Sequence, residues 1–214
     1  GKRPILVGGS GLYVRAATDR LEFPGPDPDV RARIESEVDA DRWGRHRHRP
    51  DIDPAAAAKI TPNESRRIVR ALEVIELTGR PFSAQLPDYQ AIEPTIHLGL
   101  SVERKILHER IASRVEAMWE HGWVDEVRSL LERGLAEGRT ASRAIGYAQI
   151  QQYLAGKLDR DDAQEQTTIR TRQFARRQDT WFRRDPRIVW IDATEGDHEA
   201  NAASALEAVA TTTS

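Results

Sequence analysis

The sequence predicts an α/β fold: a parallel sheet with helices around it, into which an all-helical segment is inserted. Two observations predict this arrangement. Short apolar segments with the character of buried strands alternate with amphipathic helical segments. The three apolar segments are residues 5–7, 95–102 and 187–192. Helical periodicity fills the stretch between the first two, so we expect a core of residues 1–23 and 93–214 and a helical insertion of residues 24–92.

Composition excludes several classes of protein. The chain has 214 residues, of which 39% are hydrophobic, enough for a core. It has no cysteine, which excludes disulfides, thiolate chemistry and cysteine-based zinc sites and fits a reducing compartment. No apolar run reaches 18 residues, so no membrane span is expected. We therefore expect a cytoplasmic protein that does not contact a membrane.

The net charge indicates little about function, and the kind and clustering of the basic residues indicate more. The 32 basic and 34 acidic residues give a formal net charge of −2, which does not indicate a nucleic-acid-binding protein. Only four of the 32 basic residues are lysines, so 32 − 4 = 28 are arginines, whose planar fork binds phosphate in a bidentate manner. A genome rich in G and C produces the same overall bias. Only the clustering of arginines therefore counts as an indication of function.

The first element covers residues 4–13, PILVGGSGLY. It predicts a short buried strand, a glycine turn, and a helix that begins at Ser10 or just after. Glycines let the backbone approach a ligand closely, and a helix N-terminus offers free N–H groups. The Ser10 hydroxyl either caps the helix or touches a substrate. Since strand–glycine–helix turns are common in purely structural roles, the motif alone does not decide between these functions.

The insertion is predicted to hold three helices. The first begins at Pro28 with Asp27 as its N-cap, and a short one follows Asp53. Between them, the basic residues 41–52 contain two histidines but no third metal ligand in a convincing spacing, which favours a solvated loop. The third helix is expected to be capped by Thr61 or Asn63 and to end at Gly79. On its helical wheel the apolar residues Ile68, Leu72 and Ile75 share one face, opposite Arg66 and Arg70.

Three more helices are predicted in the core. Residues 103–121 carry an apolar stripe that includes Met118, and residues 123–133 form a second helix. Gly146 interrupts a helical pattern, which a close approach of a ligand or of a neighbouring helix would justify equally well. The last long helix begins near Asp161 or Asp162.

On that helix, three arginines align on the side away from a mainly apolar group of residues. The arginines are Arg172, Arg176 and Arg183, and the opposite group is Phe174, Ala175, Gln178, Trp181 and Phe182. The arginine stripe is a plausible track for the phosphates of an RNA. As a generic pattern it is more often a solvated face.

Four blocks of sequence resemble one enzyme family, the tRNA dimethylallyltransferases, also called tRNA isopentenyltransferases. The blocks, in the family's order, are PILVGGSGLYVRA from Pro4; DPAAA from Asp53 with PNESRR from Pro62 and RALEV from Arg70; RAIGY from Arg143; and TRQFARRQ from Thr171 with TWFR from Thr180. This resemblance covers nearly the whole chain up to about Asp192. It implies a P-loop-NTPase-like parallel sheet core with an inserted helical domain that contacts tRNA.

One departure from the family is large. The family's P-loop and an adjacent aspartate precede the LVGG strand, and no G-x-x-x-x-G-K-[ST] motif occurs in this sequence. The sequence therefore resembles the C-terminal two-thirds of the enzyme, with the N-terminal part of the sheet missing. The resemblance implies Mg²⁺ for the complete enzyme, with ligands in the N-terminal part and none expected in this chain.

The resemblance also implies a reaction. The family transfers a dimethylallyl group from dimethylallyl diphosphate to N6 of the adenosine 3′ to the anticodon, so the implied partners are this diphosphate and the tRNA anticodon stem–loop. A monomer is expected. Ser10 stands where the family has a threonine at the substrate base. The implied substrate-binding residues are Gly8, Gly9, Arg143, Tyr147 and Arg172. The implied tRNA-binding residues are Arg31, Arg66, Arg67, Arg70, Arg143, Gly146, Arg176, Arg177 and Arg183.

Two further interpretations stay open. The chain is expected to be inactive alone, because its sequence lacks the phosphate loop, and a non-catalytic tRNA-binding fragment or remnant is the alternative to an enzyme. Another P-loop transferase or kinase is a weaker third option. The RAIGY and TRQFARRQ blocks argue against that third option.

Overall fold

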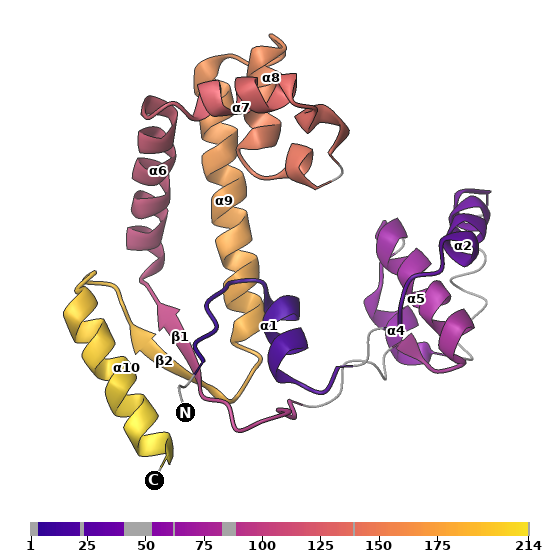
Figure 1. The fold of residues 1–214 in the computed structure, drawn as a ribbon, viewed down its shortest axis with the longest axis horizontal. Helices are drawn as coiled ribbons and strands as arrows, with labels where there is room; N and C mark the ends of the chain where they lie inside the picture. The colour runs from indigo at the N-terminus through magenta and orange to yellow at the C-terminus, as the bar shows by residue number, and fades with distance from the viewer. Residues whose placement is uncertain are drawn as a thin grey trace. The chain divides into compact units, whose positions relative to one another are not determined.

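The structure is a computed structural model, and it describes residues 4–21, 24–40, 53–61, 63–82, 89–138 and 140–213. Two compact units are present (Figure 1). One consists of Gly1–Gly11 and Ile96–Ser214, and the other of Leu12–Thr95. The domain bounds inferred from the sequence remain a prediction, and the predicted basic loop 41–52 lies outside the described residues.

The sheet of the first unit has two strands, β1 (His97–Ser101) and β2 (Ile188–Asp192). They pair in parallel, with His97 opposite Ile188 and Ser101 opposite Asp192. This confirms two of the three expected strands and their direction. The expectation of burial is only half right, because Leu98, Leu100 and Val189 are exposed while Ile191 is buried.

The third expected strand is wrong. Residues 5–7 form no strand, and Ile5 and Val7 are 86% and 89% exposed. A strand needs a neighbour that completes its backbone hydrogen bonds. Among the described residues, nothing pairs with this segment. The segment has the apolar composition of a strand, but composition alone does not show whether a neighbouring strand is present to pair with it.

Helices connect the two strands (Figure 1). The long helices α6 (Arg104–Glu120) and α9 (Arg160–Phe182) run side by side, and α7 (Trp123–Glu132) and α8 (Tyr147–Leu154) pack at the end away from the sheet. Two 3₁₀ turns, η2 (Leu135–Glu137) and η3 (Ala141–Arg143), link α7 to α8. After β2, α10 (His198–Thr213) packs against that strand.

One apolar core joins these helices. It consists of Ile111, Val115, Trp119, Trp123, Val127, Leu135, Ile150 and Ala163. On α6 the buried face follows the four-residue spacing Ile111, Val115, Trp119. Met118 lies at the edge of that face and is exposed, so its assignment to the core was wrong. The helix α9 begins one or two residues earlier than predicted, because the Asp159 side chain accepts a hydrogen bond from the Asp162 backbone N at 2.8 Å and so caps it.

The second unit is helical. It contains most of α1 (Gly11–Thr18), together with α2 (Pro28–Ala40), α4 (Pro54–Lys59) and α5 (Ser65–Thr78). Its core is formed by Ile34, Ala56, Ile60, Ile68, Val69 and Ala71. The start of α1 just after Ser10 is confirmed.

Most helix ends in this unit lie where the sequence predicts them. The Asp27 side chain accepts hydrogen bonds from the backbone N of Asp29 and Val30, and the Asp53 side chain accepts one from Ala56 N at 2.9 Å. Gly79 ends α5 with a left-handed φ of 65°. The predicted cap at Thr61 or Asn63 is wrong, because Glu64 is the N-cap residue and its carboxylate instead accepts a hydrogen bond from Thr61 N.

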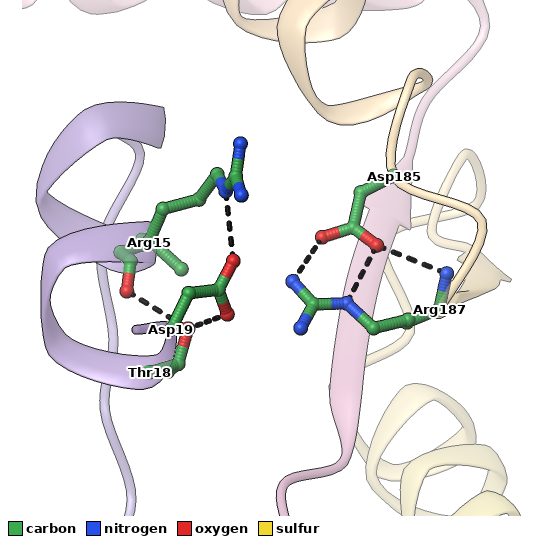
Figure 2. A network of polar contacts seen from close by, with 6 residues as sticks. Arg15, Thr18, Asp19, Asp185 and Arg187 are labelled. Atoms are coloured by element: carbon green, nitrogen blue, oxygen red, sulfur yellow. Dashed lines mark hydrogen bonds and ion pairs between the residues drawn. The ribbon is translucent and has the colours of Figure 1, made fainter. Parts of the chain in front are cut away.

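The two ends of the helical unit meet. Asp19 forms an antiparallel bridge with Ala91, and Arg20 N donates to Gln90 O at 3.1 Å. Asp19 is buried and accepts from Arg15 Nε at 2.7 Å (Figure 2). The antiparallel bridge thus joins the two ends of the helical unit, and the buried Arg15–Asp19 ion pair lies within the first of these ends.

A second buried carboxylate lies in the turn between α9 and β2. Arg187 donates to Asp185 through Nε at 2.9 Å, through Nη2 at 2.7 Å and through its backbone N at 3.0 Å (Figure 2). Burial raises the pKa of Asp185, but these bonds and the positive charge of Arg187 lower it by more. The pKa therefore lies below the ordinary value of 3.8.

This pair predicts an acid-dependent loss of stability. Between the lowered folded pKa of Asp185 and the ordinary unfolded pKa, the unfolded chain binds more protons, so the free energy of unfolding rises with pH. The stabilisation is complete above about pH 4 and is lost as the pH falls through the folded pKa. Asp185→Asn should lack this part of the pH dependence. Denaturant unfolding at several pH values measures it, and equal pH dependence in both proteins would contradict the prediction.

Candidate functional site

The glycine segment is held against α9. Gln178 Nε2 donates a hydrogen bond to Gly9 O at 2.8 Å. A Cβ atom on Gly9 would collide with the Gln178 amide, and one on Gly11 would collide with the Trp181 ring. Position 11 therefore requires glycine because the Trp181 ring fills the space beside it, whereas a Cβ at position 9 would displace the Gln178 amide and its hydrogen bond. Gly8 has open space around it, and Ser10 is exposed.

The structure joins two blocks that are far apart in the sequence. Gly9 and Gln178 are 169 positions apart, and their hydrogen bond is partly buried. The predicted substrate-side residues Gly8, Gly9 and Ser10 thus lie beside the predicted RNA helix. No pattern in the sequence indicates the hydrogen bond itself.

The predicted arginine stripe of α9 is not a continuous exposed row. Arg172 packs towards α6, where its Nη2 donates to His108 O at 3.3 Å. Arg183 pairs with Asp179 at 2.6 Å, and its guanidinium lies 4.8 Å from the centre of the Trp190 ring. Arg176 is exposed. The helical wheel correctly places the three arginines on one side of α9. It does not show that part of this side of the helix faces α6.

The RAIGY block lies between η3 and α8. Arg143 ends η3 and is exposed, and Gly146 is the N-cap residue of α8 with φ of +90°. A Cβ on Gly146 would collide with the Trp123 ring. Gly146 therefore lies at the start of a helix and not inside one, contrary to the prediction. Its positive φ and its close packing against Trp123 both explain why this position is a glycine.

Tyr147 has a partner that sequence reasoning missed. Its hydroxyl donates to the Glu126 carboxylate, and its ring lies 6.3 Å from that of Trp123. The hydrogen bond to Glu126 raises the pKa of Tyr147, which stays protonated at neutral pH. Tyr147 therefore presents a neutral, oriented ring edge rather than a phenolate.

In the helical unit, one buried glutamate holds two of the predicted RNA-binding arginines. Glu73 is 0% exposed and pairs with Arg31 Nη2 at 3.0 Å and with Arg70 Nη1 at 2.7 Å. It also accepts from Asp27 N at 3.3 Å, and Arg70 Nη2 donates to Pro24 O at 2.7 Å. Arg70, predicted to bind tRNA, is partly buried, because this carboxylate and carbonyl bind it.

The remaining arginines of this unit differ in their partners. Arg67 pairs with Glu64 at 3.1 Å on the surface. Arg66 is exposed and forms no ion pair within the described part of the chain. Glu73 was missed although it directly precedes the fully buried Val74, and an acidic residue in an apolar stretch is the signal that could have found it.

The described residues contain no group of three or more His, Asp or Glu side chains arranged to hold a metal ion. Among the helices in those ranges, none is long and apolar enough to cross a membrane.

Comparisons with known proteins give a consistent result. Residues 1–185 match the model of the family described as IPP transferase. The tRNA dimethylallyltransferase of Streptomyces coelicolor is 56% identical over 198 residues, which are 92% of this chain and 64% of that protein. The enzyme of the same name from Thermobifida fusca is 56% identical over 192 residues, 89% of this chain and 60% of that protein. The chain thus spans less than two thirds of the length of these relatives.

Solved structures agree. The tRNA isopentenylpyrophosphate transferase of Bacillus halodurans superposes with a TM-score of 0.58 at 34% identity, covering 94% of this chain and 64% of that one. A eukaryotic dimethylallyltransferase, solved acting on tRNA, gives a TM-score of 0.74 at 25% identity, covering 93% of this chain and 54% of that one. These likenesses confirm the predicted α/β fold and the predicted family resemblance.

Proposed function

Because this chain belongs to the IPP transferase family, we propose that the native protein transfers a dimethylallyl group from dimethylallyl diphosphate to N6 of the adenosine 3′ to the anticodon of a tRNA. The observation that carries the proposal is the Gln178–Gly9 hydrogen bond. It joins the glycine block to the arginine-rich helix, the two parts that the reaction needs to bring together. Substrate base and RNA backbone would then be held by one contiguous surface.

The chemistry makes distinct demands on the site. The adenosine N6 attacks the first carbon of the dimethylallyl group, the bond from that carbon to the diphosphate oxygen breaks, and the diphosphate leaves with the electron pair. N6 loses a proton to a base. The amine is a poor nucleophile, and the leaving group needs charge stabilisation. The adenine must also leave its stack to reach a protein site.

We assign roles by position. Ser10, exposed next to the fixed Gly9, is the residue that touches the substrate base, with Gly8 and Gly9 providing close backbone approach. Arg172 is the candidate for the diphosphate, because its buried Nε has no hydrogen-bond partner among the described residues. An anion beside it would satisfy that donor.

The anticodon stem–loop would be bound by the remaining predicted residues. Arg66, Arg143, Arg176 and Arg177 are exposed, which suits direct contact with phosphates. Gly146 and Tyr147 shape the adjoining surface around Trp123. Arg31, Arg67, Arg70 and Arg183 are paired with carboxylates, so any RNA contact would use only their remaining N–H groups.

Mg²⁺ is expected for the complete enzyme, but the described residues offer no cluster of ligands that fits it. The alternative function is a tRNA-binding fragment without catalysis; the 214 residues contain no phosphate-loop motif.

One experiment tests both functions. The native protein is incubated with dimethylallyl diphosphate and unmodified tRNA, and the tRNA nucleosides are analysed by mass spectrometry. We expect dimethylallyl adenosine at the position 3′ to the anticodon, and no product with tRNA that carries guanosine there. The 214-residue chain alone should bind the tRNA without turnover. An absence of product from the native protein would contradict the proposed transferase function. Steady turnover by the 214-residue chain would contradict the expectation that it is inactive alone.

A further inference from the structure

One side chain of α9 holds the open segment that leads into α1. Residues 4–8 and Ser10 are exposed, whereas Gly9 is half-buried. The Gly9 carbonyl oxygen accepts a hydrogen bond from Gln178 Nε2 at 2.8 Å. Among the described residues, residues 4–10 form no other hydrogen bond to an element beyond α1. The position of this segment therefore depends on the Gln178 amide.

The hydrogen bond constrains Ser10 as well as Gly9. A peptide group is planar, so a fixed Gly9 carbonyl also fixes the plane that contains the backbone N and Cα of Ser10. The described chain has no cis peptide bond, so the Ser10 N–H points in the opposite direction to that carbonyl. Glycine at positions 8 and 9 leaves the backbone free to take many conformations. The contact with Gln178 is therefore what selects one orientation of Ser10.

A second contact holds the other side of Ser10. A Cβ atom on Gly11 would collide with the Trp181 ring, so this ring lies directly against the Gly11 backbone. Gln178 and Trp181 are three positions apart and hence share one face of α9. One helix face thus contacts the residue before Ser10 and the residue after it, while Ser10 itself stays exposed.

This end of α9 is connected to the sheet. The Arg183 guanidinium lies 4.8 Å from the centre of the Trp190 ring on β2. The Trp190 ring fills the space in which Gly99, its partner on β1, would carry a Cβ atom. The last turns of α9 and the two strands therefore form one support, and Gln178 extends from that support to the glycine segment.

We propose that Gln178 is a positioning residue of the transferase reaction, which acts through the Gly9–Ser10 peptide to hold the Ser10 hydroxyl against the substrate base. The proposal rests on the proposed function, because that function places the base at Ser10. A misplacement of about 1 Å at a reacting centre can lower a rate by about 100-fold. Binding of a whole tRNA is spread over many contacts and is much less sensitive to such a shift. Loss of the Gln178 hydrogen bond should therefore lower kcat and leave the Kd for tRNA nearly unchanged.

A double-mutant cycle in the native protein tests this role, with kcat and the Kd for tRNA measured for each variant. The variants are Gln178→Leu, which keeps the size and removes the donor, Ser10→Ala, and the two together. The matched control is Gln166→Leu, because Gln166 is half-buried on the same helix and its side chain forms no hydrogen bond within the described ranges. We expect Gln178→Leu to lower kcat by roughly tenfold and to change Kd by less than about twofold. The control should keep both wild-type values.

The double variant shows whether Gln178 acts through Ser10. If it does, removal of Gln178 has nothing left to misplace once the Ser10 hydroxyl is gone. The kcat of the double variant should then equal that of Ser10→Ala within about twofold. Gln178→Glu is a second test with a side chain of nearly the same shape, whose carboxylate cannot donate to the Gly9 carbonyl. We expect it to lower kcat at least as much as Gln178→Leu does.

Three results would contradict the inference while the proposed function stands. They are a kcat of Gln178→Leu or Gln178→Glu equal to that of the control, a loss confined to the Kd for tRNA, and losses that multiply in the double variant. If the wild-type native protein forms no product from dimethylallyl diphosphate and tRNA, the proposed function falls and this inference with it.

Discussion

Replacing Glu73 with glutamine should destabilise the helical unit by about 3 kcal/mol, the lower end of the range for breaking a buried pair. Glu73 is fully buried and accepts from both Arg31 and Arg70. Glutamine has a similar shape but no charge, so two guanidinium groups would lose their compensating carboxylate. The value lies at the lower end because both arginine side chains stay partly exposed to water.

Hydrogen exchange of the α5 amides measures this effect within the helical unit. The matched control is Glu76→Gln on the same helix, where the glutamate is partly exposed and pairs with Arg33 on the surface. A surface pair contributes less than about 1 kcal/mol, so the control should barely change the exchange. Equal protection in Glu73→Gln and wild type would mean that the buried pair does not hold α2 and α5 together.

Replacing Gly146 with alanine should cost about 3 kcal/mol of stability in the first unit. The backbone has φ of +90°, which L-residues rarely adopt, and the new methyl group would collide with the buried Trp123 ring. The conformational strain contributes roughly 1–2 kcal/mol. Overpacking against the ring adds roughly 1–3 kcal/mol. Denaturant unfolding followed by tryptophan fluorescence measures the sum, because Trp119 and Trp123 lie in this core.

Gly156→Ala separates the two causes. Gly156 also has a positive φ, 68°, but nothing lies within 4 Å of the position its Cβ would take. We expect this control to cost about 1 kcal/mol. If both alanine variants lose the same stability, packing against Trp123 is not what requires glycine at position 146.

Local features of the fold were predictable from the sequence, whereas most features that need a distant partner, apart from the parallel direction of β1 and β2, were not. Asp27, Asp53 and Gly79 mark helix ends because caps act within a few residues. Residues 5–7 have the composition of a strand, but a strand exists only where a neighbour pairs with it. The apolar pattern does not contain that information.

The same distinction applies to the site. The resemblance predicted which blocks carry function, and the helical wheel showed which arginines share a side of α9. Neither showed that Arg172 faces α6 or that Arg31 is bound by Glu73, 42 positions away. Charge pairing across helices depends on packing, so residues that look equally basic in sequence differ in their freedom to bind RNA.

The most direct test of the account is a crosslink from the substrate base. A tRNA that carries a photoreactive azido-adenosine 3′ to the anticodon is irradiated with the native protein, and the attached peptides are sequenced by mass spectrometry. We predict attachment to residues 8–10 or to α9, because Gln178 joins these two segments. Attachment confined to α10 or to the helical unit would contradict it.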